Sequence, residues 1–474
     1  MLGHVTRATL RRLANKPERS QMGSRYDRLS IQDQNNFWVE TPDTPMHIVA
    51  VLQLDPGPLV DGRGRLKLDD IRRRIARRLD RAPRLWQVVR PGSLLTGPPV
   101  WVDEVGFDLD RHVRVGTIPA PGGDAELLKV VAWIDEQRLN RSHALWEVWF
   151  LTGLSNRRVV MVLKLHHAIA DGLAAVQLMA SLFDFTADGG GDDAQAQPWK
   201  PEAPPGRWNL MRDNAAAKVA GLGSVLTAMR TTPRALRLVL AQATQAPRSS
   251  INQPIGPHRR LAVIRIPLDE AKAAVHAHGG RVNDLLLAVV AAGLRALLLN
   301  RGESIDGLRL LTSVPVSTRH DSKLGNEVGV MVVPLAIDAD DAGTRLDAIV
   351  RDTRAAKQEQ SAVVGMMGWS LMARTGLAQL VSRRQRFVNL FVTNIAGPPV
   401  PVYVLGARLL DVYPVTPIAG NCTLGFAALS YNGCLAITAV ADADRVPDLD
   451  AVIQGMQSGW AALKSRPPVA EIAS

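Results

Sequence analysis

Strand-like apolar runs alternate with amphipathic helical segments in two long blocks of this sequence, and a stretch of different composition separates the blocks. Residues 186–206 are rich in glycine, proline, aspartate and alanine, which is typical of a linker or a long surface loop. Residues 68–79 place apolar side chains at helical spacing, whereas residues 158–165 form a continuous β-branched and apolar run. The pattern predicts two α/β halves joined by a loose middle segment.

Each half is expected to contain both kinds of element. In the first half the sequence predicts strands at 46–52 and 158–165, and helices at 68–79, 125–137 and 173–183. In the second half it predicts helices at 283–299 and 448–464, and strands at 261–266, 308–316, 328–336, 387–392, 425–430 and 435–441.

The same pattern suggests a division into domains. Residues 1–25 are expected to be a basic, mobile N-terminus, followed by an N-terminal domain at 26–185. A linker with basic amphipathic helices is expected at 186–260. A C-terminal domain at 261–464 and a tail at 465–474 complete the chain.

The cysteine content and the apolar runs exclude several classes of protein. Only two cysteines occur, Cys422 and Cys434, which excludes a disulfide-stapled secreted scaffold and a cysteine-rich zinc module. We expect two reduced thiols. No run reaches the roughly 18 consecutive apolar residues that would span a bilayer, and arginines interrupt the N-terminal segment where a signal peptide would be apolar. The sequence predicts a cytosolic protein that is not integral to a membrane.

The charge balance restricts the partners. The net charge is +11, which favours polyanions or anionic membrane surfaces. Nucleic acid is disfavoured, because there is no zinc-finger spacing or RNP-type aromatic motif and aromatic residues make up only 5% of the chain. Residues 207–249 carry seven basic residues and one acid, Asp213. Either they form basic amphipathic helices at a membrane surface, or they pack on the body with solvated charges.

The string HHAIADG at residues 166–172 lies where a buried strand is expected to end and a helix to begin. Three interpretations are open. One imidazole acts as a general base, because imidazole titrates near neutral pH. Alternatively, His166, His167 and Asp171 bind a metal, although the sequence offers no other clear ligand cluster. In the third, the histidines are satisfied core or loop residues. Gly172 permits a tight turn at the helix start.

The string resembles the HHxxxDG signature of the CoA-dependent acyltransferase superfamily. The rest of the chain, from about residue 25 to 460, resembles the bacterial wax ester synthase/diacylglycerol acyltransferase family. The segments that carry this resemblance are 29–33, 40–47, 107–113, 144–147, 282–284, 314–317, 325–326 and 394–398. Ala144 and Ala396 stand where the family usually has proline, so they bear on local rigidity more than on chemistry.

The resemblance implies an α/β fold of two chloramphenicol-acetyltransferase-like domains, each a mixed sheet with helices, with an active-site tunnel between them. It implies acyl transfer from long-chain acyl-CoA to diacylglycerol or a fatty alcohol, with no covalent enzyme intermediate. His167 is then the general base, His166 a supporting residue and Asp171 a structural one, with Gly172 in the motif turn. Asn283 is a candidate oxyanion donor, or alternatively a plain helix N-cap.

The resemblance also sets expectations for cofactors and partners. Acyl-CoA is a co-substrate, and neither a permanently bound cofactor nor a metal is expected. The enzyme is expected to be cytoplasmic and peripherally associated with the inner membrane or lipid droplets, without nucleic acid. One alternative is a carrier-protein-fed, condensation-like or polyketide-associated acyltransferase, which the segment 40–47 and the pair Asn283-Asp284 disfavour. The other is a catalytically silent lipid-binding or droplet protein, which the intact His167 disfavours.

Overall fold

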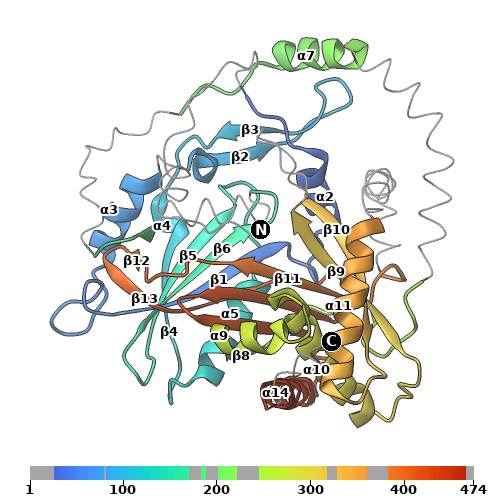
Figure 1. Cartoon of the computed structure of the whole chain (residues 1–474). Coiled ribbons are helices and arrows are strands. Elements are labelled where there is room, and N and C mark those ends of the chain that lie inside the picture. The colour runs from blue at the N-terminus through green and yellow to red at the C-terminus, as the bar shows by residue number, and fades with distance from the viewer. Residues whose placement is uncertain are drawn as a thin grey trace.

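Two mixed β-sheets with helices form the molecule in a computed structural model (Figure 1). The structure describes residues 26–79, 82–169, 183–187, 201–220, 245–317, 328–359 and 383–465. Within these residues the strand orders are β4-β5-β6-β1-β13-β12-β7 in the first sheet and β10-β9-β11-β14-β15-β8 in the second. The expected α/β architecture is confirmed.

The first sheet is built around β1 (His47–Leu54), which pairs antiparallel with both β6 (Val159–His166) and β13 (Ala407–Val415). The remaining strands are β4 (Val113–Thr117), β5 (Trp146–Thr152), β7 (Phe183–Asp184) and β12 (Tyr403–Val404). The elements before and around them are α2 (Ile31–Val39), α3 (Leu68–Leu79), η1 (Pro83–Trp86), α4 (Leu109–His112) and α5 (Asp124–Glu136).

Both faces of β1 are buried, which explains its continuous apolar sequence. Val49 and Val51 face one core cluster with Val131 of α5. Leu52 faces the opposite cluster with Ile75 of α3. The cluster beneath α5 also contains apolar residues of β8 (Arg259–Pro267) and β15 (Cys434–Asp442), so α5 packs between the two sheets.

The second sheet also contains β9 (Arg309–Ser317), β10 (Val328–Ala336), β11 (Leu390–Ala396) and β14 (Leu424–Tyr431). Its helices are α9 (Leu268–His276), α10 (Val282–Asn300), α11 (Ala342–Glu359) and α14 (Leu449–Lys464). By length and composition α10 could cross a membrane, but most of its residues are buried in the second core.

Helices α10 and α14 approach each other closely because glycine lies at their contact. A Cβ added at Gly459 would lie 2.4 Å from Ala292 Cβ, and one at Gly293 would lie 2.7 Å from the Val452 carbonyl oxygen. No real Cβ tolerates such distances, so the backbones can only meet here with glycine.

Strands β12 and β13 belong to the first sheet although they lie late in the chain. Val415 pairs with Val49, and Leu409 with Leu54 across a register shift. The sequence did not predict these strands, because residues 403–415 mix charged residues into a short apolar run. The domain boundaries remain a prediction, but these two strands connect the halves more closely than a simple linker would.

Most other predicted elements agree with the structure within about three residues. The helix at 68–79 and the strand at 328–336 have the predicted bounds, whereas the strand predicted at 387–392 lies at 390–396. Most of the helix predicted at 173–183 lies outside the described residues, and Phe183 itself is in β7. Cys422 and Cys434 are free thiols, as expected.

A separate hairpin, β2 (Gln87–Arg90) and β3 (Val100–Asp103), lies at the end of the molecule that carries α7 (Arg207–Ala220; Figure 1). Leu210 and Asn214 of α7 are buried against this region, and much of the rest of the helix surface is exposed. The basic helix predicted here therefore packs on the body with one face and presents charges with another. Residues 221–244 of the same predicted segment lie outside the described residues.

Candidate functional site

The two histidines of the motif lie where β6 ends. His166 is the last residue of the strand and pairs with His47 of β1. The chain then turns, with the Ile169 backbone N–H donating to the His166 carbonyl at 2.9 Å. The His167 N–H donates to the Met46 carbonyl at 2.8 Å, which fixes the turn against the start of β1. Asp171 and Gly172 lie outside the described residues.

His166 is held from three sides. Its Nδ1 accepts a hydrogen bond from the Ala168 backbone N–H at 3.0 Å, which places the proton of the neutral ring on Nε2. That Nε2 lies 3.7 Å from the Glu40 carboxylate. The ring also stacks on Phe37, with 4.4 Å between the ring centroids. A buried side chain with these contacts is suited to fixing the turn rather than to transferring protons.

Glu40 follows α2 and is buried beside His166. Its carboxylate accepts hydrogen bonds from two nitrogens of Arg141, one of them at 3.0 Å, and from Arg138 at 3.4 Å. Burial alone would raise the pKa of Glu40, but His166 and Arg141 outweigh burial and hold the pKa well below its usual range. Glu40 is therefore a carboxylate at neutral pH.

His167 is partly buried, and its Nδ1 lies 3.5 Å from the side-chain amide nitrogen of Asn36 in α2. A side-chain amide can turn over to offer its oxygen instead of its nitrogen. With the oxygen facing Nδ1–H, the other ring nitrogen, Nε2, carries a lone pair and can act as a base. In that turned-over orientation Asn36 would hold the ring in the tautomer that base catalysis requires.

A buried polar cluster lies on β6 and β1 next to the histidines. Lys164 Nζ donates to the carbonyls of Ile134, at 2.7 Å, and Gln137. His47 Nδ1 donates to the Asp135 carbonyl at 3.1 Å. Together they satisfy carbonyls at the C-terminal end of α5, which have no partner within the helix. Lys164 lies two residues before His166 on β6, so the cluster anchors the C-terminal end of α5 close to the histidine turn.

Burial shifts the titration of this cluster. It lowers the pKa of Lys164 to about 8 and raises the pKa of Asp135 to about 6. Burial, with the nearby Lys164 charge, also holds the pKa of His47 well below its usual value, so that His47 is neutral. The cluster was not predicted from the sequence, although a lysine inside an otherwise apolar strand is a signal that could have revealed it.

Asn283 lies in the first turn of α10 and is partly buried. The N-cap position is Arg281, whose backbone N–H donates to the Asp284 carboxylate at 2.7 Å. The interpretation of Asn283 as the N-cap is therefore wrong, because the helix begins at Val282 and Asn283 lies inside its first turn. Its role as an oxyanion donor stays a prediction.

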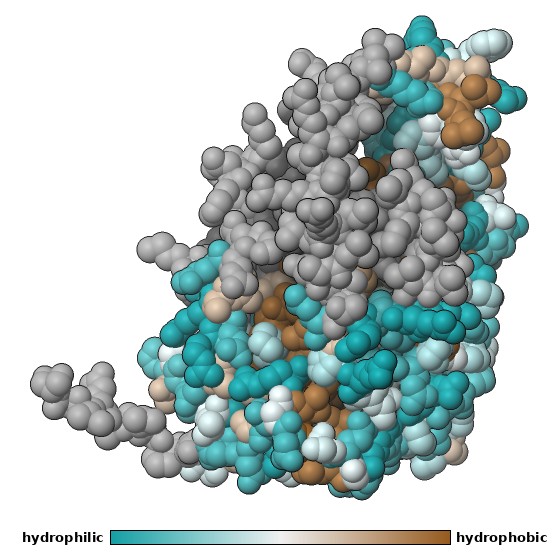
Figure 2. All heavy atoms as spheres, turned by 90° about the vertical axis from the view of Figure 1, so that its right-hand side faces the viewer, coloured by the Kyte–Doolittle hydropathy of each residue, from teal (hydrophilic) through white to brown (hydrophobic). Residues whose placement is uncertain are grey.

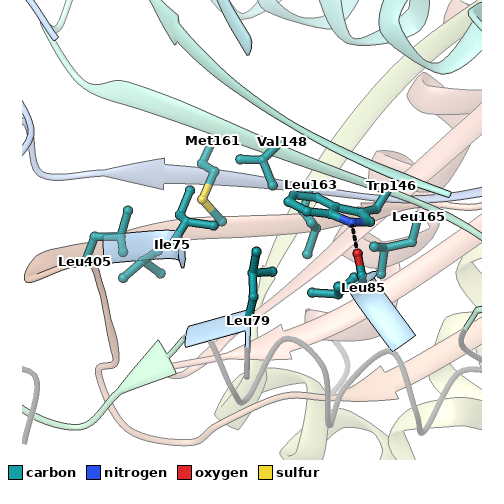
Figure 3. Close-up of a pocket in the computed structure, with 10 residues that line it drawn as sticks. Ile75, Leu79, Leu85, Trp146, Val148, Met161, Leu163, Leu165 and Leu405 are labelled. Atoms are coloured by element: carbon teal, nitrogen blue, oxygen red, sulfur yellow. Dashed lines mark hydrogen bonds between the residues drawn. The ribbon is translucent and has the colours of Figure 1, made fainter. Parts of the chain in front are cut away.

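The opposite face of β6 lines a narrow apolar cavity of about 10 Å³, room for about one water molecule (Figure 3). Met161 and Leu163 of β6 meet Ile75 and Leu79 of α3 there. Trp146 also lines it, and its indole N–H donates to the Leu85 carbonyl at 2.8 Å. Trp146 is buried and belongs to the apolar core of the first sheet.

The metal interpretation gains no further ligands from the structure. Within the described ranges, no group of three or more histidine, cysteine, aspartate or glutamate side chains could hold a metal ion. The arrangement that the structure does show is a clamped His166, a partly buried His167 and a neighbouring amide. Chemically it suits proton transfer at a hydroxyl.

Comparisons with protein families match two consecutive domains. Residues 29–286 match the wax ester synthase/diacylglycerol acyltransferase catalytic domain. Residues 324–464 match the C-terminal domain of the same family. A probable diacylglycerol O-acyltransferase of Mycobacterium tuberculosis H37Rv, tgs1, is 30% identical over 442 residues, covering 90% of this chain and 94% of the relative. A second, putative diacylglycerol O-acyltransferase of that strain is 29% identical over 459 residues.

Solved structures agree with this assignment. The wax ester synthase/diacylglycerol acyltransferase from Marinobacter aquaeolei VT8 matches with a TM-score of 0.66 at 26% identity, covering 92% of this chain and 98% of the other. The starter condensation domain of rhizomide synthetase matches with a TM-score of 0.56 at 14% identity, covering 94% and 96%. The second likeness shows the shared fold alone.

Proposed function

Since the chain belongs to the wax ester synthase/diacylglycerol acyltransferase family, we propose that it transfers the acyl group of long-chain acyl-CoA to a lipid hydroxyl. The acceptor is diacylglycerol, giving triacylglycerol, or a long-chain alcohol, giving a wax ester. The observation that carries the proposal is the different setting of the two histidines. His166 is clamped by Glu40 and Phe37, whereas His167 lies in the turn beyond the strand beside Asn36.

The reaction needs a base because a lipid hydroxyl is a poor nucleophile at neutral pH. Nε2 of His167 removes the hydroxyl proton while the oxygen attacks the thioester carbonyl carbon. The tetrahedral intermediate collapses, its carbon–sulfur bond breaks, and CoA leaves as a thiolate. The imidazolium returns its proton to that thiolate, so the enzyme ends as it began and no covalent intermediate forms. Base catalysis of this kind contributes about 10²–10⁴-fold.

The other motif residues have supporting roles in this proposal. His166 and its partner Glu40 fix the turn that presents His167, through the bond from the Ala168 N–H. For Asp171 and Gly172 the proposal keeps the roles that the resemblance implies, a structural residue and the motif turn. Asn283 supplies a hydrogen bond to the oxyanion. Acyl-CoA is a co-substrate, and the proposal needs no permanently bound cofactor or metal.

Two observations support lipid acceptors over a carrier-bound substrate. The relatives that cover 90% of this chain are named diacylglycerol O-acyltransferases, and the family models extend over both halves. The condensation domain shares only the fold. The proposed location, at the cytoplasmic face of a membrane or on lipid droplets, follows from water-insoluble acceptors and the basic α7.

The test is release of CoA thiol from palmitoyl-CoA by the purified protein, with dioleoylglycerol or hexadecanol added separately. We expect acceptor-dependent release that falls at least about 100-fold in His167→Ala. His276→Ala is the matched control, because His276 is exposed at the end of α9 and should leave the rate unchanged. The faster acceptor identifies the main product.

Three outcomes would contradict the proposal. Full activity of His167→Ala would remove the base from the mechanism. No release with either acceptor, combined with transfer from an acylated phosphopantetheinyl carrier, would favour the carrier-fed alternative. Binding of both lipids without turnover under any of these conditions would favour a silent lipid-binding protein.

A further inference from the structure

The tip of the β2–β3 hairpin exposes two adjacent leucines. Leu94 is 90% exposed and Leu95 is 58% exposed, and no large apolar side chain in the described ranges is more exposed than Leu94. The turn that carries them is closed by two backbone hydrogen bonds between Ser93 and Gly97, at 2.8 and 3.1 Å. The Ser93 and Thr96 hydroxyls also bond within the turn. The tip is therefore an ordered turn with apolar side chains at its apex.

Neighbouring elements donate hydrogen bonds to the backbone carbonyls of this turn. The Asn214 amide of α7 donates to Leu95 O at 2.8 Å and to Leu94 O at 3.3 Å. Lys218 donates to Leu94 O at 3.1 Å, and Arg28 donates to Thr96 O at 2.8 Å. The backbone carbonyls of the tip are thus bonded by the body of the protein, and the leucine side chains are exposed.

Gly97 shows how closely the tip is fitted to its support. Its φ is +85°, in the region that favours glycine, and an added Cβ would lie 2.6 Å from Asn214 Oδ1 and 2.7 Å from an Arg28 guanidinium nitrogen. An ordered turn holds its apolar side chains in a fixed place, and contiguous exposed apolar residues rimmed by polar ones mark interaction sites. Two leucines left in water at such a place point to a partner that covers them.

Helix α7, which packs against the tip, is basic. Helix α7 exposes Trp208, which is 79% exposed, together with Arg207, Arg212 and Lys218. Its single acid, Asp213, accepts a hydrogen bond from the Tyr26 hydroxyl at 2.5 Å and also pairs with Arg212 at 3.6 Å. Figure 2 shows apolar atoms among hydrophilic ones at the upper end of the molecule, the end that carries α7 in Figure 1. Apolar, aromatic and cationic side chains therefore occur together.

We propose that Leu94 and Leu95 insert into an anionic lipid surface, while the cations of α7 contact its head groups and Trp208 lies at the interface. Amphipathic segments that lie on a membrane bury their apolar residues about 5–10 Å deep, at the boundary between head groups and acyl chains. Tryptophan favours that boundary, and basic residues favour anionic lipids. A projecting turn with two leucines suits insertion, whereas a stable protein interface needs about 800 Å² of complementary surface on each partner.

The inference rests on the proposed function, since a lipid surface is where acyl-CoA acceptors of the proposed class are found. It goes beyond that function by naming the segment that docks and the charge of the surface. It also predicts that docking depends on a hairpin that is separate from the histidine site.

The test is flotation of the full chain with vesicles of phosphatidylcholine alone, or of phosphatidylcholine with about 30% phosphatidylglycerol. We expect the wild type to float with the anionic vesicles at low salt, and the double variant Leu94→Ser/Leu95→Ser to bind at least about tenfold more weakly. Leu299→Ser, at a half-exposed leucine of α10, should bind like the wild type. Flotation of the double variant equal to that of the wild type, or no flotation of the wild type, would overturn the proposal.

A second readout separates docking from catalysis. Turnover of hexanoyl-CoA with dissolved hexanol needs no lipid surface, so the double variant should match the wild type in this assay and in its melting temperature. A loss of either would show that the leucines support the fold, and would overturn docking. Absence of turnover in every protein, both with hexanoyl-CoA and hexanol and with palmitoyl-CoA and either lipid acceptor, would overturn the proposed function. Flotation that is intact in the wild type and lost in the variant would still support docking.

Discussion

Nε2 of His166 lies 3.7 Å from the Glu40 carboxylate, and only 1% of each side chain is exposed. The pair joins the end of α2 to the end of β6, because Glu40 follows the helix and His166 ends the strand. Arg141 and Arg138 complete the charge balance from the segment after α5. Three segments distant in sequence therefore meet behind the turn that carries His167.

Glu40→Gln should lower kcat while leaving KM for acyl-CoA nearly unchanged, because Glu40 positions the histidine turn and touches no substrate in the proposed mechanism. A displacement of about 1 Å at the reacting groups costs up to about 10²-fold, so we expect a loss of about 10–100-fold in kcat. Steady-state kinetics measure it. Glu147→Gln is the control, because that carboxylate pairs with Arg114 elsewhere on the first sheet and should not change kcat. An unchanged kcat in Glu40→Gln would show that His166 needs no carboxylate.

The Glu40 carboxylate also makes the stability of the fold sensitive to acid. Its pKa is lowered in the folded state from an ordinary value of 4.5, so the unfolded state binds more protons as the pH falls below that value. The stabilisation is complete above about pH 5 and is lost progressively as the pH falls toward the depressed pKa. Urea unfolding between pH 7 and pH 3 should show a steeper loss for the wild type than for Glu40→Gln. An equal loss of unfolding free energy with falling pH in the two proteins would show that the Glu40 ion pair does not stabilise the fold.

How far the sequence predicts this molecule depends on the range of the interactions. The strands and helices with regular apolar spacing, such as those at 68–79 and 328–336, were predicted because local pattern determines them. The resemblance in the motif indicated His166 and His167. Glu40, Arg141 and Lys164 could not be assigned a role, because their partners lie 27 to 126 residues away along the chain. The pairing of Val415 with Val49 spans a still longer stretch of the chain.

The buried Asp135 should make the protein less stable as the pH rises. Burial raises its pKa from 3.8 to about 6, so the folded state binds more protons than the unfolded state between these values. Stability therefore falls as the pH rises through this window. Asp135→Asn removes the buried charge and should stabilise the protein above pH 6 by about 1–3 kcal/mol. Thermal unfolding at pH 4 and pH 8 measures the difference, and a variant that is less stable at pH 8 would show that Arg259 and Lys164 compensate the charge.

Gly459→Ala should loosen the packing of α14 on α10. The added methyl group would lie 2.4 Å from Ala292 Cβ, which forces the two helices apart. Overpacking of this kind costs about 1–3 kcal/mol of unfolding free energy. Urea denaturation measures the loss, with Gly62→Ala as control, because an added Cβ at Gly62 meets nothing within 4 Å. Equal stability of the two variants would mean that α14 shifts without cost.

Asn36 supplies the most direct test of the tautomer on which the mechanism depends. Its amide lies 3.5 Å from His167 Nδ1, so Asn36→Ala removes the group that orients the ring, and kcat should fall by about tenfold or more. Asn36→Asp places a carboxylate there instead, which favours the imidazolium and should raise the pKa of His167. The acid limb of the kcat/KM profile should then shift to higher pH in Asn36→Asp but not in Asn300→Ala, a control at the exposed end of α10. If the acid limb does not shift in Asn36→Asp, His167 is not the group whose titration governs the rate, and another residue is the base.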